Sequence, residues 1–327
     1  MGSACLGEIL SGDNRMIIVK FTGGLGNQMY QYALLCMLKK RYPDVDVMAD
    51  ISMYYALDLH YGFELDSIFS LSERGKLQIA TNRQLYQGRR EIPFWGGNIG
   101  KAMQIPVSWL NARIRPGAER KGLRNVICEE STPWNGNVEK LDYALKHLDI
   151  EKNWYLDGYW QKEEYFAEVL PELITNCEFP ELNTEQERNM CQRIAETNSV
   201  SVHIRRGDYV NSKYDILGTE YYKKAIDYMN DHVEQPVFFF FSEDEHFIEE
   251  NYTWLPNKVI VSFNKGKNSY RDMQLMSLCK HNIVANSSFS NWAGYLNKNS
   301  NKIVVYPKQY TTTEENGTKK GWVRLDV

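Results

Sequence analysis

The feature of this sequence that most constrains its fold is the alternation of short apolar runs with helical segments in its second half. The helical segments begin near Glu220, Ser269 and Phe289. Buried strands that alternate with helices are typical of a parallel sheet covered by helices. The sequence therefore predicts a doubly wound α/β domain. Its five predicted strands are residues 200–204, 237–241, 259–261, 282–285 and 302–305.

The first half opens with a similar unit. An apolar run at residues 16–21 is followed by the glycine-rich loop GGLGN at 23–27, a helix-forming stretch at 29–40 and a second strand at 45–49. This order predicts a βαβ unit and a second parallel sheet. No element is predicted between residues 85 and 125, where the sequence has no clear period.

A length of 327 residues favours two domains. We expect an N-terminal extension at residues 1–15, a first lobe at residues 16–190 and a second lobe at residues 191–327. The fold class that follows is α/β, with two Rossmann-like lobes that each contain a parallel sheet.

Charge and cysteine usage exclude several classes of protein. The net charge of −4 argues against a nucleic-acid partner. The six cysteines include no CxxC pair and show no metal-ligand spacing with the six histidines, so neither a metal site nor a disulfide framework is expected. The longest apolar stretch, at residues 238–241, is far shorter than a membrane helix, and residues 1–15 do not read as a signal peptide. We expect a cytoplasmic protein without a transmembrane segment.

Polar residues follow three of the predicted strands in the second half. They are HIRRGDY at 203–209, SED at 242–244 and NSSFS at 286–290. Ligands bind at the carboxyl ends of parallel strands, so these residues are expected to share one rim. The guanidinium groups of Arg205 and Arg206 can each hold two phosphate oxygens, and the free amides of the helix that follows the third motif favour an anion. The sequence therefore predicts a diphosphate site.

Each part of this site also has a structural alternative. The two arginines could instead form an ion pair with Asp208. Ser287 and Ser288 are common helix caps, and Asp244 fits the start of a helix. The GGLGN loop lacks both the third glycine of a dinucleotide fingerprint and the Gly-Lys-Ser/Thr of a P-loop, so it is not a standard nucleotide cradle.

Four motifs occur in order: GGLGNQMYQY at 23–32, YLDGYWQ at 155–161, HIRRGDY at 203–209 and NSSFSNWA at 286–293. With them the chain resembles the bacterial α-1,2-fucosyltransferase family, glycosyltransferase family 11, over nearly everything from Met16 onward. The resemblance implies a GT-B type fold in which the second lobe holds most of GDP-fucose and the first lobe holds the acceptor. It also implies inverting transfer of L-fucose to the 2-hydroxyl of a terminal galactose, with no metal and no other cofactor.

The resemblance assigns roles to single residues. Arg205 would bind the β-phosphate and stabilise the charge that GDP carries away, Asp208 would orient this arginine, and Asn27 would orient fucose or phosphate. The proton acceptor for the incoming hydroxyl stays unassigned, with Asp208 and Glu220 as candidates. The other donor-site residues are Arg206 beside Arg205 and Asn286 before the last helix, with His203 and Asp244 for guanine and Ser287, Ser288 and Phe289 for the second phosphate contact. Gly24 and Gly26 would allow close approach of the loop to the sugar.

The acceptor platform is expected at Tyr159, Trp160 and Gln161 together with His60 and Tyr61, because aromatic faces stack on sugars and amides bind hydroxyls. For Trp160 the alternative is core packing. The acceptor implied is a galactose-terminated oligosaccharide or lipid-linked glycan of O-antigen or capsule biosynthesis, which leaves room for peripheral contact with the inner membrane. The donor motifs also fit an α-1,3 or α-1,6 linkage, or a noncatalytic sugar- or nucleotide-binding protein.

Overall fold

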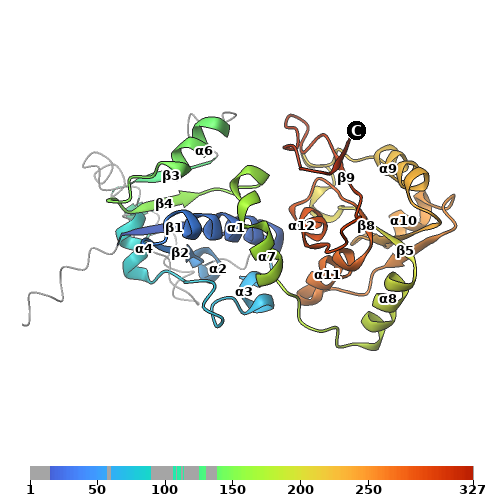
Figure 1. Ribbon diagram of the computed structural model, residues 1–327, viewed down its shortest axis with the longest axis horizontal. Coiled ribbons are helices and arrows are strands. Elements are labelled where there is room, and N and C mark those ends of the chain that lie inside the picture. Colours follow the sequence, from blue (N-terminus) through green and yellow to red (C-terminus); the bar gives the residue numbers. More distant parts are fainter. Residues whose placement is uncertain are drawn as a thin grey trace, which may run out of the picture. The chain divides into compact units, whose positions relative to one another are not determined.

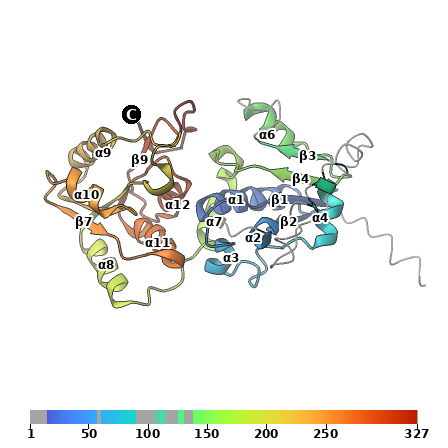
Figure 2. The same ribbon diagram turned by 180° about the vertical axis from the view of Figure 1, so that it is seen from behind.

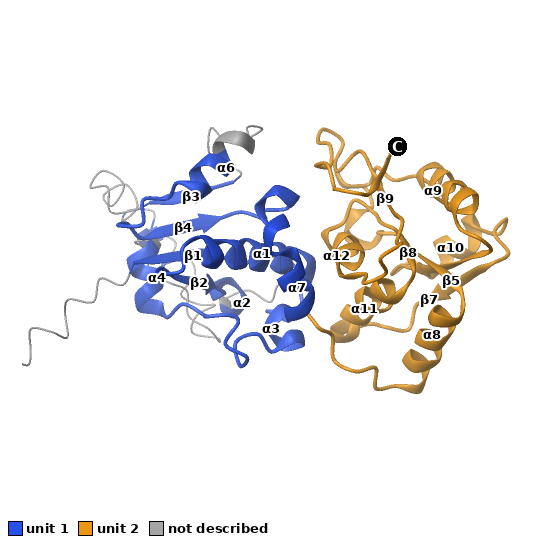
Figure 3. Cartoon of the chain, in the orientation of Figure 1, with its two compact units in different colours: residues 1–176 blue, residues 177–327 orange. Residues whose placement is uncertain are grey.

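The chain forms two compact units, residues 1–176 and residues 177–327, in the computed structural model (Figure 3). The structure describes residues 15–56, 60–89, 106–107, 109–111, 113, 125–129 and 138–326. All of the expected N-terminal extension except Arg15 lies outside the described residues. The units divide between Asn176 and Cys177, earlier than the expected boundary after residue 190, so helix α8 (Glu185–Glu196) belongs to the second unit.

The first unit contains a four-stranded parallel sheet in the order β2-β1-β4-β3 (Figure 1). The predicted βαβ unit is present as β1, α1 and β2, and two further short strands extend the sheet on the other side of β1. The bounds are β1 Met16–Lys20, β2 Asp46–Asp50, β3 Val126–Cys128, β4 Trp154–Asp157, α1 Leu25–Arg41, α2 Ser52–Ala56, α3 Glu64–Phe69, α4 Asn82–Arg89, α6 Val138–Lys146, α7 Leu170–Asn176, and the 3-10 helices η1 Glu163–Tyr165 and η2 Ala167–Val169.

Helix α1 is buried along most of its length. From Leu25 to Leu38 every residue except the partly exposed Asn27 is buried, because the helix contacts β1 and β2 as well as α3 and α7. Basic residues in its last turn face the negative end of the helix dipole. A helix enclosed in this way fixes the position of the glycine-rich loop that precedes it.

The second unit, which Figures 1 and 2 show from two sides, contains a parallel sheet of six strands. Their order is β10-β9-β8-β5-β6-β7. All five predicted strands are present, and the sixth is a short edge strand that the sequence pattern did not reveal. The bounds are β5 Asn198–His203, β6 Pro236–Phe241, β7 Lys258–Val261, β8 His281–Ile283, β9 Val304–Pro307, β10 Val323–Leu325, α9 Thr219–His232, α10 Glu245–Asn251, α11 Tyr270–Leu278, α12 Ser288–Leu296, and the 3-10 helices η3 Gly207–Tyr209 and η4 Gly266–Asn268.

In each sheet there is one pair of adjacent strands at which the chain switches from adding strands on one side to adding them on the other. In the second unit the chain runs from β5 outward through β6 and β7, and then returns to the other side of β5 as β8, β9 and β10. In the first unit the corresponding pair is β1 and β4. Connections leave such a pair in opposite directions and open a crevice at the carboxyl ends of the strands, which is where ligands bind in open α/β sheets.

The structure confirms the predicted α/β class with two Rossmann-like units. The stretch between residues 85 and 125, where no element was predicted, lies largely outside the described residues. None of the helices in the described part of the chain is both long enough and apolar enough to cross a membrane.

Candidate active site

The three polar motifs of the second unit lie where the topology predicts a ligand site. Strand β5 ends at His203, its neighbour β6 ends at Phe241, and β8 on its other side ends at Ile283. The backbone N–H of Ile204 donates to the carbonyl of Phe241 at 2.9 Å, which holds the first two motifs together just beyond the strands. The predicted donor-site residues of this unit are therefore gathered at the β5/β8 switch point.

The guanidinium of Arg205 is engaged by two carboxylates. Its Nη2 donates to Asp208 Oδ1 at 2.6 Å, and its Nη1 donates to Glu243 Oε1. The Arg205 side chain is 30% exposed, and the two carboxylates are more exposed. The ion pair with Asp208 that the sequence left open is thus present. A phosphate that used both terminal nitrogens of Arg205 would have to displace these carboxylates.

Glu243 is a residue of this site that the sequence analysis did not single out. In addition to Arg205, its carboxylate is 3.5 Å from the backbone N of Arg206, and a Cβ on Gly207 would lie 3.3 Å from Glu243 Oε1. Gly207 has a φ of +34°, in the region that favours glycine. One carboxylate therefore contacts both arginines of the turn and leaves little room beside Gly207. Its place in the Ser-Glu-Asp motif was the signal that could have identified it.

Arg206 and Asp244 form the second ion pair of the rim. Arg206 Nε lies 3.5 Å from Asp244 Oδ2, and the guanidinium stacks 4.3 Å from the centroid of the Phe247 ring. Asp244 is also the N-cap of α10, since its Oδ1 accepts a hydrogen bond from the backbone N–H of Phe247 at 3.0 Å. Asp244 therefore does start a helix, as the structural alternative expected, and its second carboxylate oxygen faces Arg206 at the strand ends.

His203 is a buried histidine held in its neutral form. Burial, together with the positive charge of Arg205, lowers the pKa of His203 to about 3. Its ring lies 5.8 Å from that of Phe289 at a tilt of 39°, and its Nδ1 has no hydrogen-bond partner among the described residues. A buried polar atom of this kind is available to a ligand and costs stability without one.

The start of α12 presents backbone amides that no side chain of the cap occupies. Ser287 is the N-cap residue but makes no capping hydrogen bond, and its side chain contacts the Tyr209 hydroxyl. Ser288 and Phe289 are partly exposed. Asn286 is buried, and its Nδ2 donates to the carbonyls of Tyr214 and Tyr310 at 3.0 and 2.8 Å. The Asn286 amide nitrogen therefore holds the surrounding loops, and the anion-binding capacity lies with the helix amides and the serines.

Asp272, in the first turn of α11, is a second residue that the sequence analysis missed. It accepts a hydrogen bond from Asn264 Nδ2 at 2.8 Å. Burial, with a smaller contribution from the Glu243 charge, raises the pKa of Asp272 to about 7. The effect of Glu243 places Asp272 behind the same rim, and a carboxyl poised near neutrality is typical of functional sites.

The first unit has its own cluster at the β1/β4 switch point. Lys20 and Asp157, the last residues of the two strands, form a salt bridge of 2.8 Å. Beyond them, Gln161 Nε2 donates to Asn27 Oδ1 at 2.9 Å. The glycine-rich loop and the 158–161 segment, which are far apart in the sequence, are thereby joined through two of the predicted site residues.

The acceptor residues predicted in this unit have different environments. His60 and Tyr61 are exposed, Tyr159 and Gln161 are partly exposed, and the His60 ring comes within 3.4 Å of where a Cβ on Gly24 would lie. Trp160 is wholly buried, so its ring packs in the core and offers no face to a sugar.

A residue that the sequence analysis missed, Glu129, shapes the segment around Trp160. Its Oε2 accepts hydrogen bonds from the backbone N–H groups of Tyr159 and Trp160, both at 2.8 Å. Trp160 has a φ of +58°, which is rare for a bulky residue. Glu129 therefore positions the turn that carries Tyr159 and Gln161.

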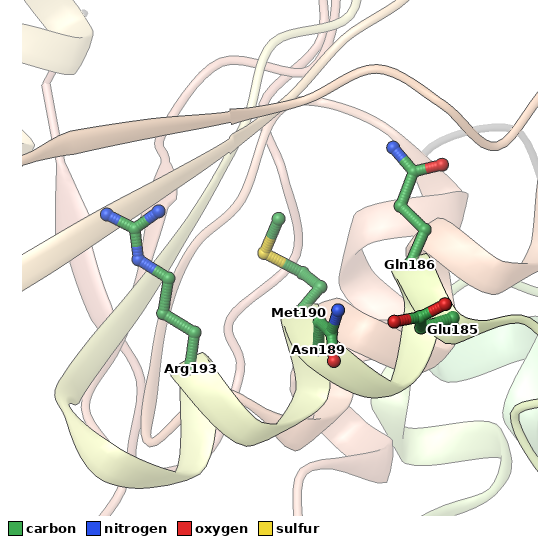
Figure 4. Close-up of a pocket in the computed structure, with 5 residues that line it drawn as sticks. All are labelled: Glu185, Gln186, Asn189, Met190 and Arg193. Carbon is green, nitrogen blue, oxygen red and sulfur yellow. The ribbon is translucent and has the colours of Figure 1, made fainter.

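An open hollow in the second unit lies elsewhere. It is lined by residues of α8 alone, and none of the predicted site residues takes part in it. Figure 4 shows the lining residues Glu185, Gln186, Asn189, Met190 and Arg193 on successive turns of the helix. The candidate site is therefore defined by the strand ends and not by this hollow.

Solved structures of two fucosyltransferases share the fold. A variant of FUT1 from Arabidopsis thaliana in complex with GDP has a TM-score of 0.51 at 13% identity, covering 92% of this chain and 72% of that one. The fucosyltransferase NodZ from Bradyrhizobium has a TM-score of 0.50 at 13% identity, covering 86% of this chain and 92% of that one. With the two parallel sheets, these likenesses establish the GT-B type fold.

Sequence comparison gives relatives over nearly the whole chain. The α-1,2-colitosyltransferase of Escherichia coli is 29% identical and covers 95% of this chain and 99% of that protein. The O-antigen biosynthesis glycosyltransferase WbnK of Escherichia coli is 27% identical and covers 93% and 98%. A sequence model of the family described as "Glycosyl transferase family 11" matches residues 119–326, which is more than half of the chain. The four motifs, the fold and this match lead to one conclusion, that the chain belongs to glycosyl transferase family 11.

Proposed function

We propose that this glycosyltransferase moves L-fucose from GDP-fucose to the 2-hydroxyl of a terminal galactose, with inversion at the anomeric carbon. The observation that carries the proposal is the cluster at the β5/β8 switch point. Two guanidinium groups lie there beside a helix whose first amides have no side-chain cap. A diphosphate is the part of the donor that fits such a cluster, because forked donors and helix amides both favour phosphate oxygens.

In this proposal Arg205 acts on the leaving group. The acceptor oxygen attacks the anomeric carbon while the bond to the β-phosphate breaks, and GDP leaves with additional negative charge. Glycosyl transfer passes through an oxocarbenium-like transition state, so stabilising the departing phosphate lowers the barrier. The β-phosphate would take the place of Glu243 or Asp208 on the Arg205 fork. No covalent sugar–enzyme intermediate takes part.

The acceptor would bind to the first unit, near the Asn27–Gln161 contact and the exposed His60 and Tyr61. The test is a panel of acceptors, including lactose, incubated with labelled GDP-fucose, with the product linkage read by NMR. We expect an α-1,2 linkage to galactose. A product linked α-1,3 or α-1,6 would contradict the proposed acceptor position, and GDP binding without transfer to any acceptor would favour a noncatalytic binding protein.

A second candidate donor is supported by one relative. The α-1,2-colitosyltransferase covers almost the whole of this chain at 29% identity, so transfer of colitose in the same linkage is the alternative activity. The ratio of kcat/KM for the two nucleotide sugars distinguishes the donors, because this ratio measures differential transition-state binding. A higher value for the colitose donor would replace fucose in the proposal.

Transfer is expected to persist in excess EDTA. In the proposed site the diphosphate charge is met by Arg205, Arg206 and the α12 amides, and in the described residues no three His, Cys, Asp or Glu side chains form a group that could hold a metal ion. The measurement is the initial rate with and without chelator. A loss of more than about tenfold, roughly 1.4 kcal/mol of barrier, would show that a divalent ion supports the leaving group.

Replacing Asp244 with asparagine tests the assignment of guanine recognition. Asparagine is also a good N-cap, so the start of α10 should persist while the carboxylate is lost. We expect GDP to bind roughly tenfold more weakly, at a cost of about 1.4 kcal/mol, with an unchanged acceptor KM. The measurement is calorimetric titration with GDP.

If Asp244 only neutralises Arg206, the same change frees a positive charge and GDP binds as well as before or more tightly. The matched variant Asp272→Asn removes the buried carboxyl group behind the rim. Loss of GDP binding in Asp272→Asn alone would move guanine recognition from Asp244 to Asp272.

A further inference from the structure

Glu64 is a buried carboxylate that faces no neutralising charged side chain among the described residues. It is the first residue of α3 and is 8% exposed. Burial raises its pKa to about 6, and the backbone N–H of Leu25 lowers it by a smaller amount. In the described part of the chain, no charged side chain contributes to this pKa. A buried carboxylate with so little compensation destabilises the fold.

Two other buried carboxylates of the described residues, Asp50 and Glu187, are well compensated. Asp50 accepts hydrogen bonds from the Ser52 backbone at 2.9 Å and from the Tyr155 hydroxyl at 2.7 Å. Glu187 accepts from the Thr184 backbone at 3.0 Å and faces Arg271. These groups have evident structural roles. The Glu64 carboxylate gains only the amide of Leu25 at the start of α1, which does not offset its burial, and groups compensated so little are concentrated at functional sites.

Glu64 lies beside the glycine-rich loop. Gln28 ties the two segments together, because its Nε2 donates to the carbonyls of Gly23 and Gly62 at 3.0 and 3.1 Å and its Oε1 accepts from the Leu65 backbone at 2.9 Å. The interaction with the Leu25 amide places the Glu64 carboxylate at the first turn of α1, the turn that also carries Asn27. The carboxylate is therefore next to the loop that is proposed to approach the sugar.

Three other titratable side chains of the described residues, Tyr54, Tyr159 and His60, border this position. Tyr54 of α2 donates its hydroxyl to the Gly23 carbonyl at 2.7 Å, and burial, with a smaller contribution from Glu64, raises the pKa of Tyr54. Tyr159 adds to that shift from the segment after β4. His60 packs its ring on Gly24 and is exposed. The raised pKa keeps Tyr54 neutral at working pH, which leaves His60 as the rival base.

We propose that Glu64 is the general base of the transfer reaction, a role that rests on the proposed function. The acceptor hydroxyl gives its proton to the Glu64 carboxylate as its oxygen forms the bond to the anomeric carbon. The bond between that carbon and the β-phosphate oxygen breaks, and its electron pair leaves with GDP. Glu64 then releases the proton to solvent. The two candidates from the sequence fit less well, because Asp208 holds Arg205, and Glu220 is 81% exposed in a surface pair with Lys224.

The raised pKa of Glu64 suits this role, since a base works best when its pKa is close to the working pH. The base must be ionised, so kcat should fall as the pH drops through about 6. Because the folded state favours the protonated carboxyl, the raised pKa of Glu64 contributes to folding stability at low pH. This contribution to stability is lost as the pH rises through about 6.

The decisive variant is Glu64→Gln, which keeps the shape and a hydrogen-bond acceptor for the Leu25 amide. We expect kcat with GDP-fucose and lactose to fall about 100-fold, as for loss of a general base. The acid limb of the pH profile, which is the fall in kcat below about pH 6, should disappear. GDP affinity should stay within about twofold, which is about 0.4 kcal/mol. The melting temperature at neutral pH should stay the same or rise, because a buried charge is removed. Glu73→Gln, an exposed carboxylate of the same unit, is the matched control.

Three results obtained with the Glu64→Gln enzyme would overturn the proposal. One is a Glu64→Gln enzyme with nearly full kcat, and another is an acid limb that survives in this variant. The third is a lower melting temperature with kcat per folded molecule unchanged, which would make Glu64 a structural cap of α1. If His60→Gln removes the acid limb instead, the base is His60. A wild-type enzyme that transfers no fucose would overturn the proposed function together with this inference, whereas an active Glu64→Gln variant overturns the inference alone.

Discussion

Replacing Arg205 with lysine is expected to leave the protein folded and to lower kcat by roughly 100-fold or more, comparable to the loss of one preorganised donor to a developing oxyanion. Lysine keeps the charge but not the planar fork, so it cannot hold two phosphate oxygens at once. GDP should still bind tolerably in the ground state. The loss should appear in kcat and in kcat/KM together, because the contact strengthens as the leaving group gains charge.

The alternative is that Arg205 has only a structural role in its ion pairs. Arg205 contacts Asp208 and Glu243, and a purely structural role would appear as lost stability with unchanged turnover per folded molecule. All three side chains are partly exposed, so these pairs should contribute no more than about 1 kcal/mol to folding. Melting temperature and steady-state kinetics measured on one preparation separate the two roles. Arg193→Lys on α8 makes the same chemical change away from the rim and should leave both unchanged.

The order of strands and helices could be predicted wherever buried runs and helices alternate. This held for β5 to β9 and for β1, α1 and β2, because strands buried in a parallel sheet are apolar on both faces and give a continuous signal. The first and last residues of β3, β4 and β10 are only partly buried, so these short strands carry little such signal. The switch points followed from strand order, which a sequence pattern alone does not specify.

The candidate site was predicted only where its chemistry is local in the sequence. Arg205 and Asp244 lie in compact polar motifs directly after strands, and strand ends are where sites are sought. Glu64 and Asp272 lie at helix starts, where a carboxylate is ordinary, and only burial distinguishes them. The sequence left open whether Trp160 stacks on a sugar or packs in the core. The answer depends on whether its ring faces solvent or the core, which local sequence does not determine.

Replacing Gly158 with alanine is expected to destabilise the first unit by about 3 kcal/mol. A Cβ at this position would lie 2.6 Å from the Cβ of Glu129, 2.8 Å from its Oε2 and 3.0 Å from Cε2 of Trp160. Glu129 Cβ is fixed to the backbone and Trp160 is enclosed in the core, so neither can move aside cheaply. Any displacement of Glu129 also weakens its hydrogen bonds to the backbone N–H groups of Tyr159 and Trp160.

The effect should reach the Asn27–Gln161 contact, because the displaced turn carries Gln161. We expect a lower melting temperature and a reduced kcat, with GDP affinity retained if the donor binds to the second unit as proposed. Gly317→Ala is the control, since a Cβ there would meet nothing within 4 Å. In a Glu129→Ala background the added cost of Gly158→Ala should shrink, because one source of the clash is gone and the two amides have already lost their acceptor. Equal costs in the two backgrounds would show that Glu129 does not set this turn.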